Sequence, residues 1–141
     1  MMTRIAKEYR WEMGHRLVFH AGLCKNIHGH SYSLRIQLEG EVDQNGMILD
    51  FYELSTIVEP IIEELDHSFL CDESDSVMIE FFLNNPMKAV VVPFVTTAEN
   101  ICSWILDRIV EALKHNTRIC SISARLNETE RAWAERTVVL R

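Results

Sequence analysis

Three histidines in the amino-terminal part of the chain have the residue type and spacing of a metal site. His28 and His30 are separated by one glycine, and residues two apart in a strand point to the same side, so both imidazoles can reach one ion. His15 follows an earlier predicted strand, and a hairpin would bring it opposite this pair. Three neutral nitrogen ligands leave one coordination position open, as catalytic zinc requires. The sequence therefore predicts a Zn²⁺ site formed by His15, His28 and His30.

Cys24 precedes this histidine pair by four residues, and two roles remain open for it. As a fourth ligand it would close the site and make it structural. As a nearby thiolate, activated by the positive charge of the metal, it would be a reactive group. A cupin site also uses two histidines around one residue, but there a glutamate normally follows, and Ser31 to Arg35 contain none. A cupin is therefore disfavoured.

The hydrophobic pattern predicts the elements that must position these residues. Residues 3–12 and 31–42 are expected to be strands joined by a long connection, and residues 51–66 an amphipathic helix. A second helix is expected to begin after Thr97 as N-cap and to end near His115. Residues 117–127 and 133–140 are expected to be two further strands. The prediction is an α+β fold, a four-stranded antiparallel sheet with two main helices on one face.

The segment around residues 71–95 is predicted to be an insert in a single domain that spans residues 1–141. Within it, residues 75–85 are expected to form a short helix capped by Asp75, and residues 88–92 a short strand or an extended connection. The other three cysteines, Cys71, Cys102 and Cys120, form no CxxC pair and are expected to be reduced, small core residues.

Composition limits the class of partner. A chain of 141 residues with 48% hydrophobic residues can bury the core of one domain, and it has no apolar run long enough for a signal peptide or membrane span. A cytoplasmic location is expected. The formal net charge of −7 argues against nucleic acid and anionic membrane as partners. A small molecule is the expected partner.

Several motifs in order along the chain together resemble a known enzyme family. They are His15, Cys24-x-x-x-His28-Gly29-His30, Asp66-His67, Thr97-Ala98-Glu99-Asn100 and Glu128-Thr129. With these motifs the chain resembles the 6-pyruvoyl-tetrahydropterin synthase family. The three residues between Cys24 and His28, and the segment Ile48-Leu49-Asp50-Phe51, are most similar to its bacterial branch, which forms 6-carboxy-5,6,7,8-tetrahydropterin in the queuosine pathway.

The resemblance implies a fold, an assembly and a reaction. The fold would be the tunnelling fold, whose sheets assemble into trimeric β-barrels that commonly pair into a homohexamer with active sites between subunits. The enzyme would be a zinc-dependent carbon-carbon lyase. It would convert 7,8-dihydroneopterin triphosphate to 6-carboxytetrahydropterin, acetaldehyde and triphosphate.

The resemblance also implies roles for individual residues. Cys24 would be the general base, and His67 would exchange protons while Asp66 orients it, which requires irregular backbone between these neighbours. Glu128 would act in catalysis as the pterin anchor, because a carboxylate can accept paired hydrogen bonds from the ring. Thr97 would line the substrate pocket, although its role as N-cap also explains it. For the triphosphate, the candidate cations are Lys7, Arg10, Arg16 and Lys25.

Three other functions remain open at this point. A pyruvoyl-forming synthase or an aldolase acting on dihydroneopterin would use the same fold and site, and the released product separates them: acetaldehyde marks the carboxytetrahydropterin enzyme and glycolaldehyde marks the aldolase. The third alternative is a non-enzymatic module that binds a metal or a pterin.

Overall fold

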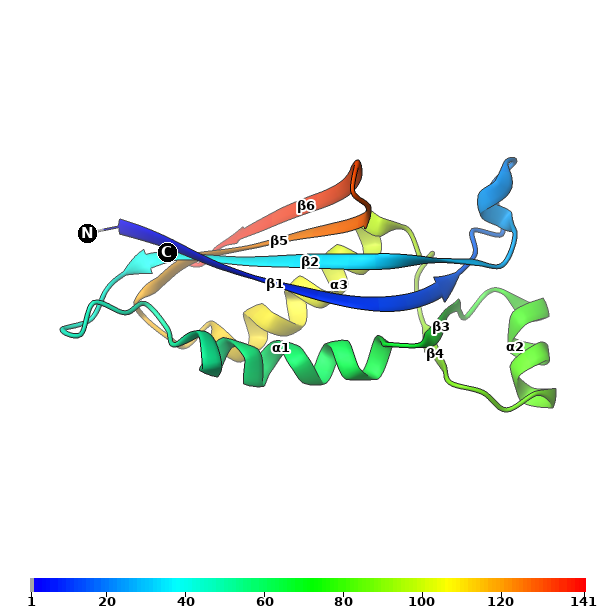
Figure 1. Ribbon diagram of the computed structural model, residues 1–141, viewed down its shortest axis with the longest axis horizontal. Coiled ribbons are helices and arrows are strands. Elements are labelled where there is room, and N and C mark those ends of the chain that lie inside the picture. Colours follow the sequence, from blue (N-terminus) through cyan, green and yellow to red (C-terminus); the bar gives the residue numbers. More distant parts are fainter. Residues whose placement is uncertain (1) are drawn as a thin grey trace.

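The computed structural model describes residues 2–141 of the chain. In chain order its elements are β1 (Met2–His15), the 3-10 turn η1 (Leu23–Lys25), β2 (His28–Glu41), α1 (Phe51–Leu65), β3 (Ser68–Asp72), α2 (Ser76–Asn84), β4 (Ala89–Val92), α3 (Ala98–Leu113), β5 (Ile119–Thr129) and β6 (Ala132–Val139). All six of these strands belong to one sheet in the order β4-β3-β1-β2-β5-β6 (Figure 1).

The centre of the sheet is the hairpin of β1 and β2. The two strands pair antiparallel along their full length, from Met2 opposite Glu41 to His15 opposite His28. Buried residues alternate with more exposed ones in the second half of β1 and through most of β2, as expected for a sheet with one covered face. The predicted strands at 3–12 and 31–42 are confirmed, and both extend further toward the connection than predicted. This extension brings the histidines themselves into the paired strands.

Helices α1 and α3 lie side by side on one face of the sheet (Figure 1). Each begins at a capping side chain: Asp50 accepts a hydrogen bond from the Tyr52 N–H, and Thr97 accepts one from the Asn100 N–H. The buried stripes of both helices face the sheet, and the core includes Leu54, Val58, Leu65, Ile101, Ile105, Ile109, Leu34, Ile36, Ile122 and Leu126. The predicted helices and the N-cap role of Thr97 are confirmed.

The prediction of a four-stranded antiparallel sheet is wrong in both strand number and direction. Strands β1, β2, β5 and β6 are antiparallel as predicted, but β3 adds to the edge of β1 in parallel at Met13 and Gly14, and β4 adds to β3 in parallel. The chain leaves α1 at Leu65 and runs directly alongside the end of β1, and this path makes β3 parallel. The apolar pattern of so short a strand does not reveal its partner.

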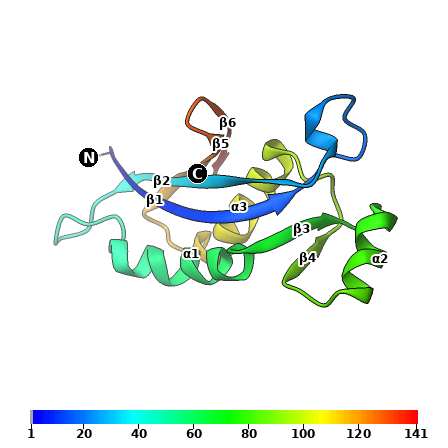
Figure 2. The same cartoon turned by 45° about the vertical axis from the view of Figure 1, so that its right-hand side comes forward.

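The segment around residues 71–95, predicted to be an insert, contains the end of β3, α2 and β4 and lies at the end of the sheet where β1 and β2 are connected (Figure 2). The predicted short helix is confirmed as α2, and Asp75 caps it by accepting a hydrogen bond from the Met78 N–H at 3.3 Å. The predicted strand at 88–92 is confirmed as β4. A small second apolar cluster, Phe69, Cys71 and Met78, packs the insert internally.

The described helices leave the other face of the sheet uncovered (Figure 1). Its side chains are mostly polar, with Arg4 paired to Glu39 and the Ser31 hydroxyl donating to Glu12 at 2.7 Å. Among residues 2–141 no helix is long and apolar enough to cross a membrane.

Candidate metal and pterin site

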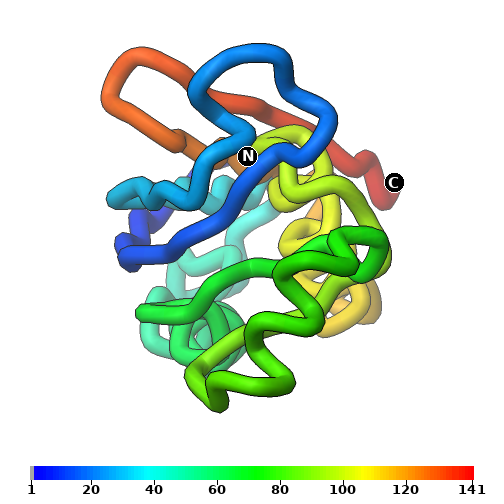
Figure 3. The backbone as a smooth tube through the Cα atoms, turned by 90° about the vertical axis from the view of Figure 1, so that its right-hand side faces the viewer, coloured from blue at the N-terminus to red at the C-terminus, as the bar shows by residue number. Residues whose placement is uncertain are grey.

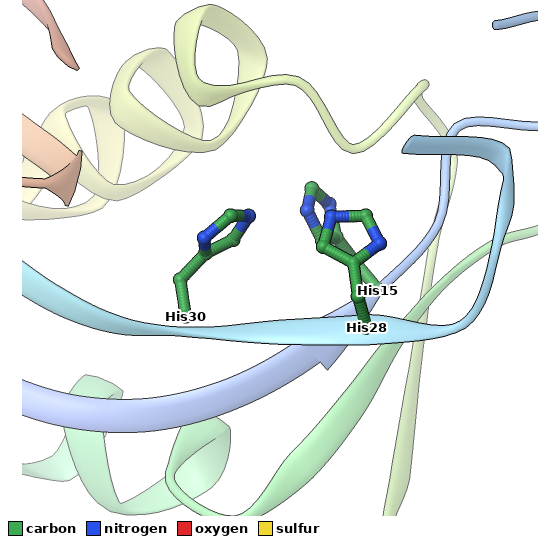
Figure 4. Close-up of side chains that lie close together, drawn as sticks. All are labelled: His15, His28 and His30. Atoms are coloured by element: carbon green, nitrogen blue, oxygen red, sulfur yellow. The ribbon is translucent and has the colours of Figure 1, made fainter. Parts of the chain in front are cut away.

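The three predicted metal ligands converge at the connected end of the hairpin. His15 is the last residue of β1 and lies directly opposite His28, the first residue of β2, while His30 follows on the same face. Their ring centroids are 4.7 to 5.2 Å apart, and one nitrogen from each ring lies within 4.8 Å of the other two (Figure 4). These three histidines can hold one metal ion.

Glycine at position 29 allows the two strands to approach closely at this site. A Cβ atom placed on Gly29 would lie 3.0 Å from the carbonyl oxygen of Met13, on the neighbouring strand. That neighbour is backbone and cannot move without separating the strands. The glycine between His28 and His30 therefore keeps His15 within reach of both.

Hydrogen bonds to backbone carbonyls orient two of the three rings. His15 Nδ1 lies 2.8 Å from the Thr96 carbonyl oxygen, and His28 Nδ1 lies 2.7 Å from the Asn26 carbonyl oxygen. Because a carbonyl only accepts, each Nδ1 carries the proton and each Nε2 offers its lone pair. Both Nε2 atoms are buried and have no hydrogen-bond partner in the described chain. Buried acceptors without a partner, aimed at a common point, fit a divalent metal.

Burial in the site also favours the neutral form of His15 and His30. Burial lowers the pKa of His15 to about 4; the Thr96 carbonyl opposes this shift, and His28 and His30 reinforce it. Burial likewise lowers the pKa of His30, while the nearby Glu128 carboxylate opposes the shift. Neutral imidazole is the form that binds metal, so the residues are ready for an ion at neutral pH.

Cys24 lies in the connection between β1 and β2, within η1. It is half-buried, and its carbonyl oxygen accepts a hydrogen bond from the Leu17 N–H at 2.8 Å. Among the described residues, the group that can hold a metal contains the three histidines and not Cys24. The structure thus favours an open site over a closed one with Cys24 as fourth ligand.

Asp66 and His67 form a hydrogen-bonded pair at the junction of α1 and β3. Asp66 Oδ1 lies 2.9 Å from His67 Nδ1 and also accepts a hydrogen bond from the Glu12 N–H at 3.0 Å, while the His67 N–H donates to the Glu12 carbonyl at 2.7 Å. His67 has a φ of 58°, in the left-handed region. The irregular backbone predicted for this pair is therefore present, and it turns both side chains toward each other.

The Asp66–His67 pair lies next to a cavity on the hairpin. His67 lines a cavity of about 410 Å³ together with Glu12 and Ser31, whose side chains alternate with those of Met13 and His30 along the hairpin, and His30 also lines this cavity. The His67 side chain is 76% exposed. His67 therefore shares a cavity with His30, but it is not one of the described residues that can hold the metal ion.

Glu128 lies near the end of β5 and shares a cavity with His30. This cavity has a volume of about 570 Å³ and is lined by Glu8, Arg10, Gly29, His30, Ser31, Ser33, Asn127, Glu128, Thr129 and Glu130. Glu128 also contributes to the raised pKa of Tyr32, whose main cause is burial. The structure therefore brings the predicted pterin anchor close to the predicted metal ligands.

The candidate cations for the triphosphate are not equally available. Lys7 donates to the Ser55 hydroxyl at 2.5 Å, and Arg16 makes two hydrogen bonds of 2.6 Å to Asp75. Arg10 lines the Glu128 cavity, and Lys25 is exposed next to Cys24. Arg10 and Lys25 thus remain the freer candidates.

Sequence analysis missed two residues at the site, Thr96 and Tyr32. It gave weight to Thr97, which caps α3, whereas the neighbouring Thr96 orients His15. No local pattern indicates a contact between residues so far apart in the chain. Tyr32 is fully buried beside His30, with ring centroids 5.4 Å apart. Strand alternation was a usable signal here, because Tyr32 is two residues after His30.

The chain matches the family model described as 6-pyruvoyl tetrahydropterin synthase over residues 4–138. This match covers nearly all of the sequence. The protein therefore belongs to the 6-pyruvoyl tetrahydropterin synthase family, which confirms the resemblance inferred from the motifs.

Similar proteins and structures extend this result. The chain is 36% identical over 142 residues to 6-carboxy-5,6,7,8-tetrahydropterin synthase of Haemophilus influenzae, covering 95% of this chain and 98% of that protein. It is 38% identical over 129 residues to the putative 6-carboxy-5,6,7,8-tetrahydropterin synthase of Pyrococcus horikoshii, covering 83% and 78%.

Two solved structures share the fold at lower identity. The first is an uncharacterised protein from Wolinella succinogenes, with a TM-score of 0.81, 24% identity and coverage of 96% of this chain and 98% of that chain. The other is 6-pyruvoyl tetrahydropterin synthase from Plasmodium vivax, with a TM-score of 0.80, 17% identity and coverage of 99% of both chains. They show that the α+β fold described above also occurs in these two solved proteins.

Proposed function

We propose that this protein is a zinc-dependent 6-carboxytetrahydropterin synthase that converts 7,8-dihydroneopterin triphosphate to 6-carboxy-5,6,7,8-tetrahydropterin, acetaldehyde and triphosphate. The names of the similar proteins from H. influenzae and P. horikoshii support this product over the pyruvoyl one. The observation that carries the proposal is the pair of buried, unpartnered Nε2 atoms of His15 and His28 beside His30. Such a cluster is built for an ion with an open position for substrate.

The metal would be held by His15, His28 and His30. Zinc bound there would supply Lewis acidity, lowering the pKa of hydroxyl groups on the substrate side chain. The carbonyls of Thr96 and Asn26 keep the Nδ1 proton in place on two of these rings, so their ligating nitrogens need no rearrangement.

The remaining residues would bind the ring and move protons. Glu128 accepts hydrogen bonds from the pterin N–H and amino groups, in the cavity that it shares with His30. Cys24, as thiolate, removes a proton from the side-chain carbon. His67 exchanges protons through Nε2, because Asp66 holds its Nδ1.

We further propose that two copies of the chain complete each site in a homo-oligomer built from trimers, most simply a hexamer. The position of His67 supports this, since its side chain is 76% exposed and is not part of the described group that can hold the metal. The sheet also has two edges suited to ring closure: β6 at one end, and the outer side of β1, which pairs with β3 only at Met13 and Gly14.

The direct test is incubation of the zinc-loaded protein with 7,8-dihydroneopterin triphosphate, with acetaldehyde and the pterin product followed by mass spectrometry. Acetaldehyde together with 6-carboxytetrahydropterin is expected. A pyruvoyl product or release of glycolaldehyde would assign the site to a different reaction. Metal binding without turnover of any dihydropterin would indicate a binding module.

A further inference from the structure

A buried ion pair connects Asp75 in the insert to Arg16, the residue after His15. Arg16 Nε and Nη2 donate to the two carboxylate oxygens of Asp75, each at 2.6 Å. The side chains are 19% and 3% exposed. Asp75 also caps α2 through the Met78 N–H, so one carboxylate holds both the start of the helix and the end of β1. A bidentate pair of arginine and carboxylate fixes the relative orientation of the two side chains as well as their distance.

Thr96, which follows the insert directly, makes hydrogen bonds to both His15 and Arg16. Thr96 is fully buried, and its hydroxyl donates to the Arg16 carbonyl at 3.4 Å while its own carbonyl accepts from His15 Nδ1. The segment from Asp75 to Thr96 therefore closes around His15 and Arg16. Figure 3 shows the segment before α3 passing beside the end of β1.

The chain leaves the sheet at this point, and the Leu17 N–H donates to the Cys24 carbonyl at 2.8 Å within the connection. β1 ends at His15, and the connection that follows has the exposed side chains Val18, Phe19 and Leu23. A buried ion pair adds little net stability compared with apolar residues of the same volume, because both charges lose water. The ion pair instead fixes the position of the backbone at the end of β1, directly after the candidate ligand His15.

We propose that Arg16 and Asp75 are positioning residues of the metal site. Their ion pair holds the end of β1 so that His15 Nδ1 meets the Thr96 carbonyl and His15 Nε2 faces His28 and His30. Neither residue belongs to the described group that can hold the metal. The inference rests on the proposed metal site and extends it by assigning a role to the insert.

The first test is the Asp75→Asn variant. Asparagine remains a good N-cap, so α2 keeps its cap and only the charged pair with Arg16 is lost. We expect zinc affinity, measured by competition with a chromophoric chelator, to fall about 10-fold or more, as for other groups that orient a metal ligand. The matched control is Asp107→Asn, which removes the exposed pair with Arg136 and should leave affinity unchanged.

The second test separates positioning from stability. The double variant Arg16→Met/Asp75→Asn removes both charges of the pair, while asparagine can still cap α2 and methionine replaces the apolar stem of the arginine. We expect it to give a native circular dichroism spectrum and a cooperative thermal transition, yet to bind zinc as weakly as the Asp75→Asn variant. Wild-type zinc affinity in either variant would overturn the proposal.

A third readout does not need metal. Long-range ¹⁵N–¹H spectra of the imidazole rings, with His15 assigned by its loss in His15→Gln, report which nitrogen is protonated. We expect the metal-free wild type to show His15 as the Nδ1–H tautomer and both variants to show a mixture. An unchanged tautomer in the variants would overturn the inference. A wild type without zinc affinity would instead contradict the proposed metal site, and the tautomer measurement would still decide the role of the ion pair.

Discussion

His15 Nδ1 and the carbonyl oxygen of Thr96 are 2.8 Å apart, although 81 positions separate the two residues in the chain. This hydrogen bond decides which nitrogen of His15 is free, because the carbonyl can only accept and so retains the proton on Nδ1. The backbone just before α3 thereby sets the protonation of a ligand at the end of β1.

Loss of one ligand should abolish tight metal binding. For His28→Ala we expect zinc affinity to fall at least about 100-fold, because two imidazoles cannot complete the coordination that three provide. Inductively coupled plasma mass spectrometry after dialysis measures the zinc retained. The control is His115→Ala, which removes an exposed histidine outside the cluster and should retain wild-type zinc. Equal zinc in both variants would rule out the site.

Metal-free protein should lose stability as the pH falls. Burial lowers the pKa of His15 from 6.5 to about 4, so the unfolded chain takes up this proton first. The contribution of neutral His15 to the free energy of unfolding is fully present above pH 6.5 and is lost as the pH falls toward about 4. This contribution to the free energy of unfolding amounts to roughly 3 kcal/mol. Urea unfolding of the apo protein across this pH window measures it.

The control for this pH dependence is His15→Gln. Glutamine does not titrate, so the free energy of unfolding of the variant should depend less steeply on pH in the same window. Identical slopes for the variant and the wild type would show that His15 does not have the lowered pKa.

Removal of the Cys24 thiol should stop the reaction without removing the metal. For Cys24→Ala we expect kcat to fall by about 10²–10⁴, the usual contribution of a general base, with zinc content unchanged. Cys120→Ala is the matched control, since Cys120 is also half-buried but lies on β5. Activity near that of the wild type in Cys24→Ala would exclude Cys24 as the base.

Two inactive variants should restore each other if the site lies between copies. Cys24→Ala and His67→Asn are each expected to be inactive alone. After joint refolding in equal amounts, random mixing should give about a quarter of wild-type activity, because one site in four receives both intact groups from different copies. If the mixture remained inactive while forming mixed oligomers, each site would be contained in one chain.

Glu128→Gln should mainly weaken binding of the pterin. An amide accepts one set of hydrogen bonds but presents its N–H₂ to the ring donors, so KM should rise about 10-fold or more with zinc unchanged. Glu130→Gln is the control, because Glu130 is an exposed neighbour that lines the same cavity. A similar KM in the two variants would leave Glu128 without an anchoring role.

The sequence alone determined those features that depend on local spacing. Alternation in β2 indicated that His28 and His30 share a face, and helical periodicity with Asp75 and Thr97 as caps located α2 and α3. These predictions succeeded because each depends on the geometry of a few consecutive residues. The order of motifs likewise sufficed to recognise the family.

Only the tertiary structure decided how distant segments meet. The parallel addition of β3 and β4, the contact of Thr96 with His15 and the ion pair of Arg16 with Asp75 all join residues far apart in the chain. The face on which His67 lies also follows from its left-handed backbone and its bonds to Glu12, not from its neighbours in sequence. Local periodicity carries no information on such pairings, because many partners would satisfy the same apolar and polar pattern.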